Sequence, residues 1–283
     1  MTARHVVMAE VDHYAVCYTI TPWMRPEEWN RHGDGARLAA QAQWSALGER
    51  LRLAGLEVLT VPAAAGLPDL VFTANSAIVL DGRALPARFR HLERRGEEAH
   101  FRRFFEGLKE QGLLSEIGRL PEGVFQEGAG DCIWDATRQV FWAGYGPRSS
   151  AASLTEIGGF FEREVVGLRL ATERYYHLDT CFLPLSGGEV VYYPPAFTAA
   201  ARAAIAERVP KDKLIAAGDD AAAAFSLNAV NIGRDLIMAA PPPALRQRLE
   251  ELGYRCLPVE LSSFILSGGG AFCMTLRLDL TGG

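Results

Sequence analysis

The sequence contains no long hydrophobic run and no cluster of basic residues. No stretch approaches the roughly 18 apolar residues of a membrane-spanning helix, and the N-terminal segment is too polar to form a signal-peptide core. The formal net charge is −5, which excludes the electrostatic signature of a nucleic-acid-binding or anionic-membrane-binding protein. We therefore expect a cytoplasmic protein with a small-molecule partner, no nucleic acid and no membrane.

Cysteines are few, odd in number and far apart in the chain. They are Cys17, Cys132, Cys181, Cys256 and Cys273. No CxxC motif and no Cys/His pair has the spacing of a metal site, so we expect no metal. This usage is typical of a reducing compartment, where cysteines remain free thiols.

A recurring order of helix, strand and hairpin is the main organisation that the sequence does contain. Helices are predicted at residues 26–54, 93–112, 152–164, 196–209 and 243–253. The units are roughly 45 to 60 residues long, a period that indicates a propeller or another circular array. Turns such as GG and GR favour antiparallel hairpins within each unit, although a doubly wound parallel sheet stays an alternative.

The predicted first strand covers residues 13–24, and residues 67–80 read as a strand with a polar interruption. Closure of the array requires the Cys273 strand to pair with the N-terminal strand near Val16, which leaves no exposed sheet edge. The first helix is expected to bury Leu38, Trp44, Leu47, Leu51 and Leu53 on one face.

Polar or reactive residues stand at the starts of the predicted hairpins. These residues are Asn75, Glu127, Asp131, His177, Asp179, Asn228 and Cys273. A circular array brings them together around one axis, and buried polar groups are costly there unless they are paired or used. The pattern therefore predicts a functional site on the axis.

Cys273 directly follows a glycine triplet, Gly268 to Gly270. A free cysteine is usually a small core residue, but a flexible glycine entry favours a thiol that is presented for reaction. His177 is the candidate base for this thiol, and Glu127 is the candidate carboxylate that orients the imidazole. A structural histidine and a solvated turn carboxylate are the alternative interpretations.

Six motifs occur in order along nearly the whole chain: FTAN, ERRGEE, EGAGD, GYGPR, YHLDTC and GGGAFCMTL. With them the chain resembles the guanidine-modifying enzymes of the pentein fold, which include arginine deiminases, arginine dihydrolases, dimethylarginine dimethylaminohydrolases and amidinotransferases. The resemblance implies one catalytic α/β domain over residues 1–283. It also implies a five-bladed propeller of ββαβ units with pseudo-fivefold symmetry, whose active site lies in the central channel.

By the same resemblance, Cys273 is the nucleophile, His177 the general acid and base, and Glu127 the carboxylate that orients His177. No metal or organic cofactor is implied. The mechanism implied is cleavage of guanidino C–N bonds through a covalent thiouronium intermediate on the cysteine.

Five further residues match substrate-binding positions. Asp179 matches a carboxylate that holds the guanidinium, for which a carboxylate fork is the natural partner. Arg94 and Arg148 match arginines that bind the α-carboxylate of the substrate. Phe72 is expected to form a wall of the channel, and Asp69 to meet the polar end of the substrate.

Two positions leave the product open. Arginine deiminases carry a second aspartate where this chain has Asn75, an amide that resembles the arginine dihydrolases, which leave ornithine. In those enzymes the segment near the first strand resembles INPWM. This chain reads ITPWM there, with Thr21 in the asparagine's place. Dimethylarginine hydrolases typically lack the aspartate that matches Asp179.

We therefore expect a hydrolase that acts on L-arginine or an Nω-substituted arginine. A dimethylarginine dimethylaminohydrolase, an amidinotransferase and a non-catalytic pentein binding protein stay open as well. The expected partner is a small guanidino compound, and both a monomer and a homo-oligomer remain open.

Overall fold

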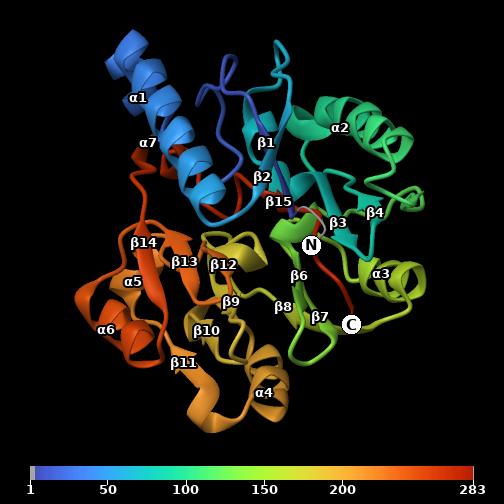
Figure 1. Cartoon of the computed structure of the whole chain (residues 1–283), viewed down its shortest axis with the longest axis vertical. Coiled ribbons are helices and arrows are strands. Elements are labelled where there is room, and N and C mark those ends of the chain that lie inside the picture. The colour runs from blue at the N-terminus through green and yellow to red at the C-terminus, as the bar shows by residue number, and fades with distance from the viewer. Residues whose placement is uncertain (1–3, 283) are drawn as a thin grey trace.

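The computed structural model describes residues 4–282, which form five three-stranded sheets around a central axis (Figure 1). In each sheet the inner strand pairs antiparallel with the middle strand, which pairs parallel with the outer strand. The predicted five-bladed propeller of ββαβ units is thereby confirmed, and the doubly wound parallel sheet is excluded.

The strands of the five blades are short, and each blade takes one strand of each kind. The inner strands are β15 (Leu276–Arg277), β3 (Ala77–Leu80), β6 (Cys132–Asp135), β9 (Phe182–Pro184) and β12 (Val230–Ile232). The middle strands are β1 (His5–Ala9), β4 (Arg83–Pro86), β7 (Val140–Tyr145), β10 (Val190–Tyr192) and β13 (Asp235–Met238). The outer strands are β2 (Glu57–Val61), β5 (Glu116–Ile117), β8 (Glu164–Arg169), β11 (Leu214–Ala216) and β14 (Arg255–Pro258).

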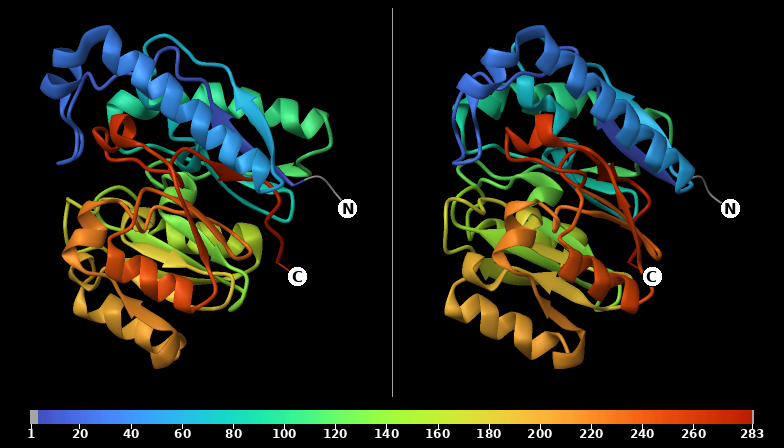
Figure 2. Two further views of the ribbon diagram at one scale, coloured as in Figure 1. Left: turned by 60° about the vertical axis from the view of Figure 1, so that its left-hand side comes forward. Right: turned by 90° about the vertical axis from the view of Figure 1, so that its left-hand side faces the viewer.

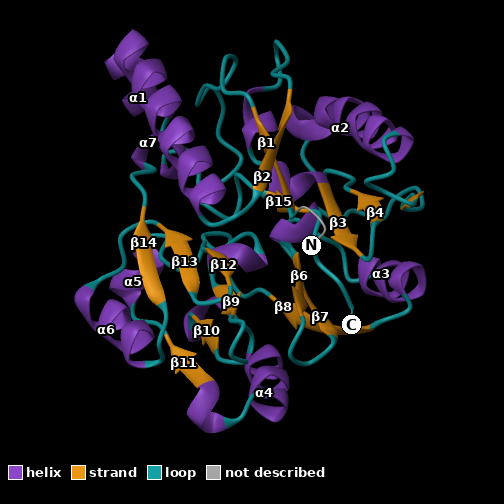
Figure 3. Ribbon diagram, in the orientation of Figure 1, coloured by secondary structure: helices purple, strands orange, loops and turns teal. Residues whose placement is uncertain are grey.

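Helices join the middle strand to the outer strand of each blade and lie on the periphery of the ring (Figure 3). They are α1 (Pro26–Leu53), α2 (Leu92–Glu110), α3 (Ser153–Phe161), α4 (Ala199–Arg208) and α6 (Pro243–Glu251). All five were predicted. Two short helices, α5 (Asp219–Ala223) and α7 (Ser262–Ile265), were not. No helix between residues 4 and 282 has the length and apolar character that crossing a membrane requires.

The ring closes through the first blade, as the sequence predicted, but at a different strand. The inner strand β15 pairs with β1, where Val6 is opposite Arg277 and Val7 is opposite Leu276. The start of β1 and the segment after β15 consequently lie on the same face of the ring (Figure 2). The predicted pairing near Val16 is wrong.

Residues 13–24 form a loop, not the predicted strand. The alternating hydrophobicity has another cause, because Tyr14 is buried against Trp29, Phe72 and Phe264. Apolar residues that a loop packs under a helix produce the same alternation as a half-buried strand.

The prediction for the buried face of α1 is only partly correct. Leu47 and Leu51 are buried, whereas Leu38 and Leu53 are 73% and 74% exposed. The buried stripe includes Ala40, Leu47 and Leu51, a helical spacing of four and seven residues that leaves positions 38 and 53 on the opposite side.

Five hydrophobic clusters fill the five interfaces between neighbouring blades. Successive side chains of one inner strand enter different interfaces, as alternation along a strand requires. Phe182 of β9 packs with Trp142 of the third blade, and Leu183 packs with Leu236 of the fifth blade. Each inner strand is thus held by packing on both of its faces. This packing also holds the segment that precedes the strand.

Short 3-10 turns precede three of the inner strands. The 3-10 turns of the chain are η1 (Pro68–Val71), η2 (Thr73–Ser76), η3 (Gly128–Gly130), η4 (Leu178–Thr180), η5 (Pro194–Ala196) and η6 (Lys211–Lys213). The predicted strand over residues 67–80 is therefore wrong up to residue 76, because η1 and η2 occupy that part. Two of these turns, η2 and η4, carry Asn75 and Asp179, which contact His177 and Cys273 of other blades.

Candidate active site

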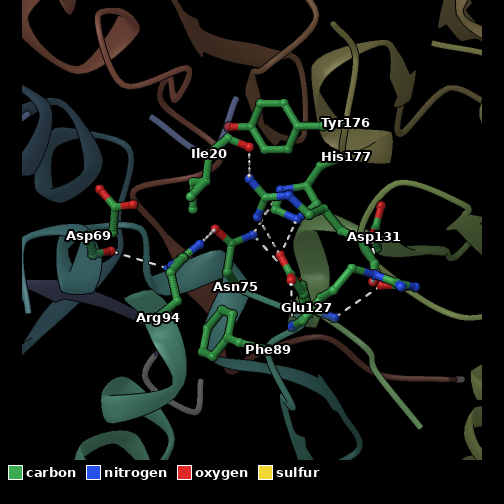
Figure 4. Close-up of polar contacts among 12 residues, drawn as sticks. Ile20, Asp69, Asn75, Phe89, Arg94, Glu127, Asp131, Tyr176 and His177 are labelled. Atoms are coloured by element: carbon green, nitrogen blue, oxygen red, sulfur yellow. Dashed lines mark hydrogen bonds and ion pairs between the residues drawn. The ribbon is translucent and has the colours of Figure 1, made fainter. Parts of the chain in front are cut away.

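His177 and Glu127 form a buried ion-pair contact on the axis, with 2.7 Å between His177 Nε2 and Glu127 Oε2 (Figure 4). Arg148 Nη1 donates to the same oxygen at 2.9 Å. Burial acts to raise the pKa of the Glu127 carboxyl, but Arg148 and His177 hold this pKa well below its usual value. Glu127 is therefore ionised and lies where it can orient His177; its catalytic role stays a prediction.

Asn75 links Arg94 to His177. Its Oδ1 accepts a hydrogen bond from Arg94 Nη1 at 2.8 Å, and its Nδ2 lies 3.4 Å from His177 Nδ1 (Figure 4). A guanidinium only donates, so this contact fixes which end of the amide is oxygen. The amide N–H then faces His177 Nδ1, which assigns the ring proton to Nε2, on the side of Glu127.

The Cys273 thiol lies between two side chains from other blades. Its Sγ donates to Asp179 Oδ2 at 3.0 Å and accepts from Asn228 Nδ2 at 3.1 Å. Burial, together with the nearby Asp179, raises the pKa of the Cys273 thiol well above its ordinary value. Burial also raises the pKa of the Asp179 carboxyl to about 7. A cation that enters beside both groups favours their ionised forms.

Asn228 holds the nucleophile in a second way, since its Oδ1 accepts from Cys273 N at 3.1 Å. The hairpin-start pattern had placed Asn228 at the axis without assigning it a role. No motif in the sequence marks this residue, because an asparagine before a strand is common in turns. Only the spatial arrangement reveals that it forms hydrogen bonds with both the thiol and the backbone N–H of Cys273.

The glycine triplet is explained by close approach. Gly268 has a φ of 81°, as the predicted turn requires. A Cβ on Gly269 would lie 2.2 Å from the Phe72 ring, and a Cβ on Gly270 would lie 2.8 Å from Asn228 Oδ1. Phe72 therefore packs against the loop that carries Cys273, and its place in the wall of the channel stays a prediction.

Asp69 is buried and only partly satisfied. Its Oδ2 accepts from Tyr18 at 2.8 Å, whereas its Oδ1 has no partner within residues 4–282. Burial raises the pKa of this carboxyl, although Arg94 acts to lower it. A buried carboxylate oxygen without a donor is the acceptor that an incoming ammonium group needs.

The two arginines predicted to bind a substrate carboxylate already have partners. Arg94 donates to Glu97 through Nε at 2.9 Å and through Nη2 at 2.7 Å, and it also donates to Asn75. Arg148 contacts Glu127 and the Ile20 carbonyl oxygen, which lies 3.3 Å from Nη2. The role of both in carboxylate binding stays a prediction. The Glu97 partnership was missed, because ERRGEE offers several carboxylates at helical spacing.

Asp131 joins the third blade to the fourth beside His177. Its Oδ1 accepts from Leu178 N at 3.0 Å, and its Oδ2 accepts from Ser149 Oγ at 2.6 Å. Burial raises the pKa of the Asp131 carboxyl to about 6. These contacts fix the backbone directly after His177, so Asp131 positions the imidazole without touching it.

Thr21 lies in the loop over the site. Within residues 4–282 its side chain makes one hydrogen bond, accepted from Trp23 N at 3.1 Å, which closes a turn of this loop. Its neighbour Ile20 contacts Arg148 through the backbone. Thr21 thus shapes the loop, and its role in substrate binding stays a prediction.

Metal-ligand geometry does not occur in the described part of the chain. Among residues 4–282, no three His, Cys, Asp or Glu side chains are grouped in a way that would hold a metal ion. The site instead consists of a thiol, an imidazole, carboxylates and amides. Such a set can perform nucleophilic attack, acid–base transfer and the binding of a planar cation.

Comparison with known proteins agrees with this arrangement. A family model described as eukaryotic N,N dimethylarginine dimethylhydrolase matches residues 25–280. The chain is 41% identical over 273 residues to a bifunctional arginine dihydrolase/ornithine cyclodeaminase of Synechocystis, a match that covers 96% of this chain but 37% of the relative. It is 31% identical to the N(G),N(G)-dimethylarginine dimethylaminohydrolase of Mycobacterium tuberculosis, over 97% of this chain and 86% of that protein.

A solved structure provides the matching fold. The N-terminal domain of ArgZ, a cyanobacterial arginine dihydrolase, solved as a Cys-to-Ser variant with bound substrate, superposes with a TM-score of 0.91 at 39% identity. The match covers 98% of this chain and 99% of that domain. The chain therefore belongs to the dimethylarginine dimethylaminohydrolase family of guanidine-modifying enzymes, and its propeller is the pentein fold.

Proposed function

We propose that this protein hydrolyses the guanidino group of free L-arginine through a covalent adduct on Cys273. The contact between Cys273 Sγ and Asp179 Oδ2, at 3.0 Å, carries the proposal. It places a nucleophile beside a carboxylate whose other oxygen has no donor within residues 4–282. A guanidinium that donates to this carboxylate brings its carbon next to the sulfur.

The reaction proceeds in two halves. The Cys273 sulfur attacks the guanidino carbon and gives up its thiol proton, one C–N bond breaks, and His177 returns this proton to the departing nitrogen, which leaves as ammonia. Water then attacks the thiouronium carbon, His177 accepts a proton from that water, and the C–S bond breaks to release a ureido product. One water is consumed and one ammonia is formed. Glu127 stabilises the His177 cation that forms on the way.

The amino-acid end of the substrate lies, in this proposal, among Asp69, Arg94 and Arg148. The unpartnered Asp69 oxygen accepts from the α-ammonium group. Arg148 stacks on Tyr176, with its guanidinium 4.6 Å from the ring centroid, and retains N–H groups for the α-carboxylate. Phe72 forms the wall between this end and Cys273.

We further propose that hydrolysis occurs twice and leaves ornithine. Asn75 is neutral and presents an N–H toward the imidazole. An amide there donates to the oxygen of a neutral ureido group, which an ionised aspartate does not do. Support also comes from the arginine dihydrolase relatives, of whose full length the chain spans 37% and 38%.

Product analysis by mass spectrometry tests these proposals, with arginine, citrulline and dimethylarginine as separate substrates and a Cys273→Ser variant as control. Ornithine from both arginine and citrulline is expected. Citrulline as the terminal product excludes the second hydrolysis. Release of dimethylamine from dimethylarginine instead favours the activity after which the matching family model is named.

Amidino transfer and binding without catalysis are distinguished from hydrolysis by two additional measurements. An amidinotransferase yields an amidino-acceptor product, with no free ammonia, when acceptor amines are supplied. A non-catalytic binding protein leaves Cys273 unmodified by a chloroacetamidine-type probe. The homo-oligomer remains a prediction that light scattering tests.

A further inference from the structure

A cavity of ≈ 440 Å³ lies along the axis of the ring, behind the catalytic residues. The inner strand of every blade contributes to its wall. Lining residues include Val79 of β3, Ile133 of β6, Leu183 of β9, Val230 of β12 and Leu276 of β15. The catalytic side chains immediately precede these same strands in the chain. The cavity therefore lies next to the site, along the inner strands.

At its inner end the cavity adjoins the site, although Cys273, His177 and Glu127 are not among its lining residues. Asp179, which accepts from the Cys273 thiol, is one of its lining residues. Ala129 and Phe272 also line the cavity, and both are partly exposed although Cys273 and Glu127 near them in the chain are buried. The cavity therefore ends beside Asp179, which is itself only 1% exposed.

At its outer end the cavity opens to the surface. Thr137, Ser186 and Gly233 line it there and are exposed. Arg4 and Leu280 also line it, which places the mouth on the face where β1 starts and the segment after β15 runs (Figure 2).

The opposite approach to the site is closed. The Ile20 carbonyl oxygen accepts from Arg148, and the Tyr176 hydroxyl donates to the Gly268 carbonyl oxygen at 2.6 Å. Arg94 and Arg148, where the proposed amino-acid end lies, are only 3% and 2% exposed. A bound amino acid thus has protein over it.

We propose that this cavity is a second passage to the reacting centre, which admits water and releases ammonia while the amino-acid end stays covered. The inference rests on the proposed function. Each hydrolysis consumes one water, whose oxygen bonds to the guanidino carbon, and forms one ammonia from the broken C–N bond.

Two rounds on one substrate make a separate exit necessary. The first ammonia must leave before the second hydrolysis, while the ureido intermediate stays bound at Asp69 and Arg148. Departure through the covered side would require this intermediate to leave as well. Asp179 lies at the inner end of the passage, and its carboxylate is suited to accept a hydrogen bond from the departing nitrogen.

A variant with a closed mouth tests the passage. Thr137 and Ser186 belong to neighbouring blades, line the mouth and are exposed, so Thr137→Trp/Ser186→Trp fills the opening without repacking a core. Thr137→Ala/Ser186→Ala is the matched control, since it removes the same polar groups and leaves the mouth open. A crystal structure of the tryptophan variant verifies that both indoles lie in the mouth.

Two readouts are compared between these variants and the parent. The first is ammonia release from arginine, together with the fraction of Cys273 trapped as adduct by acid quench. The second needs no substrate: it is the rate at which hydrogen peroxide, a molecule close to water in size, oxidises Cys273, measured by mass spectrometry.

Closing the mouth is expected to lower kcat for ammonia release and the peroxide rate by roughly five-fold or more, with more adduct trapped and KM little changed. The alanine control retains parental rates. Unchanged rates in a variant with a filled mouth overturn the passage. If the parent releases no ammonia from arginine but the peroxide rate still falls, the proposed function fails and the passage stands.

Discussion

The amide nitrogen of Asn75 lies 3.4 Å from Nδ1 of His177, whose Nε2 is 2.7 Å from ionised Glu127, and the two contacts together leave Nδ1 free of a proton. The neutral side chain at position 75 allows His177 to direct its N–H at Glu127 and to keep Nδ1 as the base. Arg94 secures the orientation by donating to the amide oxygen. The protonation pattern of the site therefore depends on an uncharged residue.

Replacement of Asn75 by aspartate is expected to shift the product from arginine from ornithine towards citrulline. A carboxylate at this position pairs with the cationic guanidinium of arginine but has no N–H to donate to the oxygen of a neutral ureido group. Product analysis by mass spectrometry measures the ratio of the two products, and an Asn75→Asp enzyme with the parental products contradicts the assignment.

Asn228→Ala is expected to lower kcat by roughly ten- to a hundred-fold while KM for arginine changes little. The variant loses both hydrogen bonds to Cys273, so the sulfur is no longer held against Asp179. Asn231, three residues later in the same hairpin, serves as control because it accepts from Ser186 N and donates to Gly233 O, away from Cys273. Its alanine variant should keep the parental kcat. Equal losses in the two variants would point to a general folding defect.

The raised pKa of Asp179, about 7, predicts a pH-dependent affinity for arginine. Below this pH the carboxyl is protonated and cannot pair with the guanidinium, so binding must release a proton. Titration calorimetry in a Cys273→Ser background is expected to give an affinity that weakens up to tenfold per pH unit below about pH 7. An additional Asp179→Asn change should give weak binding with no such dependence.

The raised pKa of Asp179 also predicts that removal of its charge increases the free energy of unfolding. Because the folded pKa lies above the unfolded value of 3.8, the folded state binds the proton more tightly, and stability falls as pH rises from about 4 to about 7. Asp179→Asn should therefore raise the free energy of unfolding at pH 8 by about 1–3 kcal/mol and have little effect at pH 4. Urea unfolding at the two pH values measures this, and a larger effect at pH 4 would contradict the sign.

Glu97→Ala is expected to destabilise the fold by about 3–5 kcal/mol, because it leaves the Arg94 cation buried without its ion-pair partner. Glu93, in the first turn of the same helix, is exposed and provides the control. Glu93→Ala should change the free energy of unfolding by less than about 0.5 kcal/mol. Chemical denaturation of both variants makes the comparison.

Repeated local patterns were sufficient to predict a propeller or another circular array, and the family resemblance added the five-bladed ββαβ architecture. The hairpin turns and the five amphipathic helices depend on neighbouring residues, and these patterns are written in the sequence. The polar residues at the hairpin starts, including Asn75, Glu127 and His177, could be placed on one axis for the same reason. A circular array of the units is sufficient to bring these residues together.

Contacts between segments that are far apart in the chain could not be predicted from the sequence. Whether residues 13–24 form a strand depends on Tyr14 finding Phe264 far along the chain, which no local pattern reports. The partner of Arg94 was likewise ambiguous, because several carboxylates lie within a helical turn and only packing selects Glu97. The two hydrogen bonds between Asn228 and Cys273 depend on how the fourth hairpin start packs against the last.

Closure of the ring by β15 has a consequence for synthesis of the enzyme. The inner edge of β1 stays unpaired until residues 276 and 277 have been made, and the thiol at position 273 reaches Asp179 in the same event. A nascent chain therefore has four blades but no nucleophile in place. Pairing between segments this distant is slow to form, so the appearance of activity is expected to follow, and never to precede, completion of the fold.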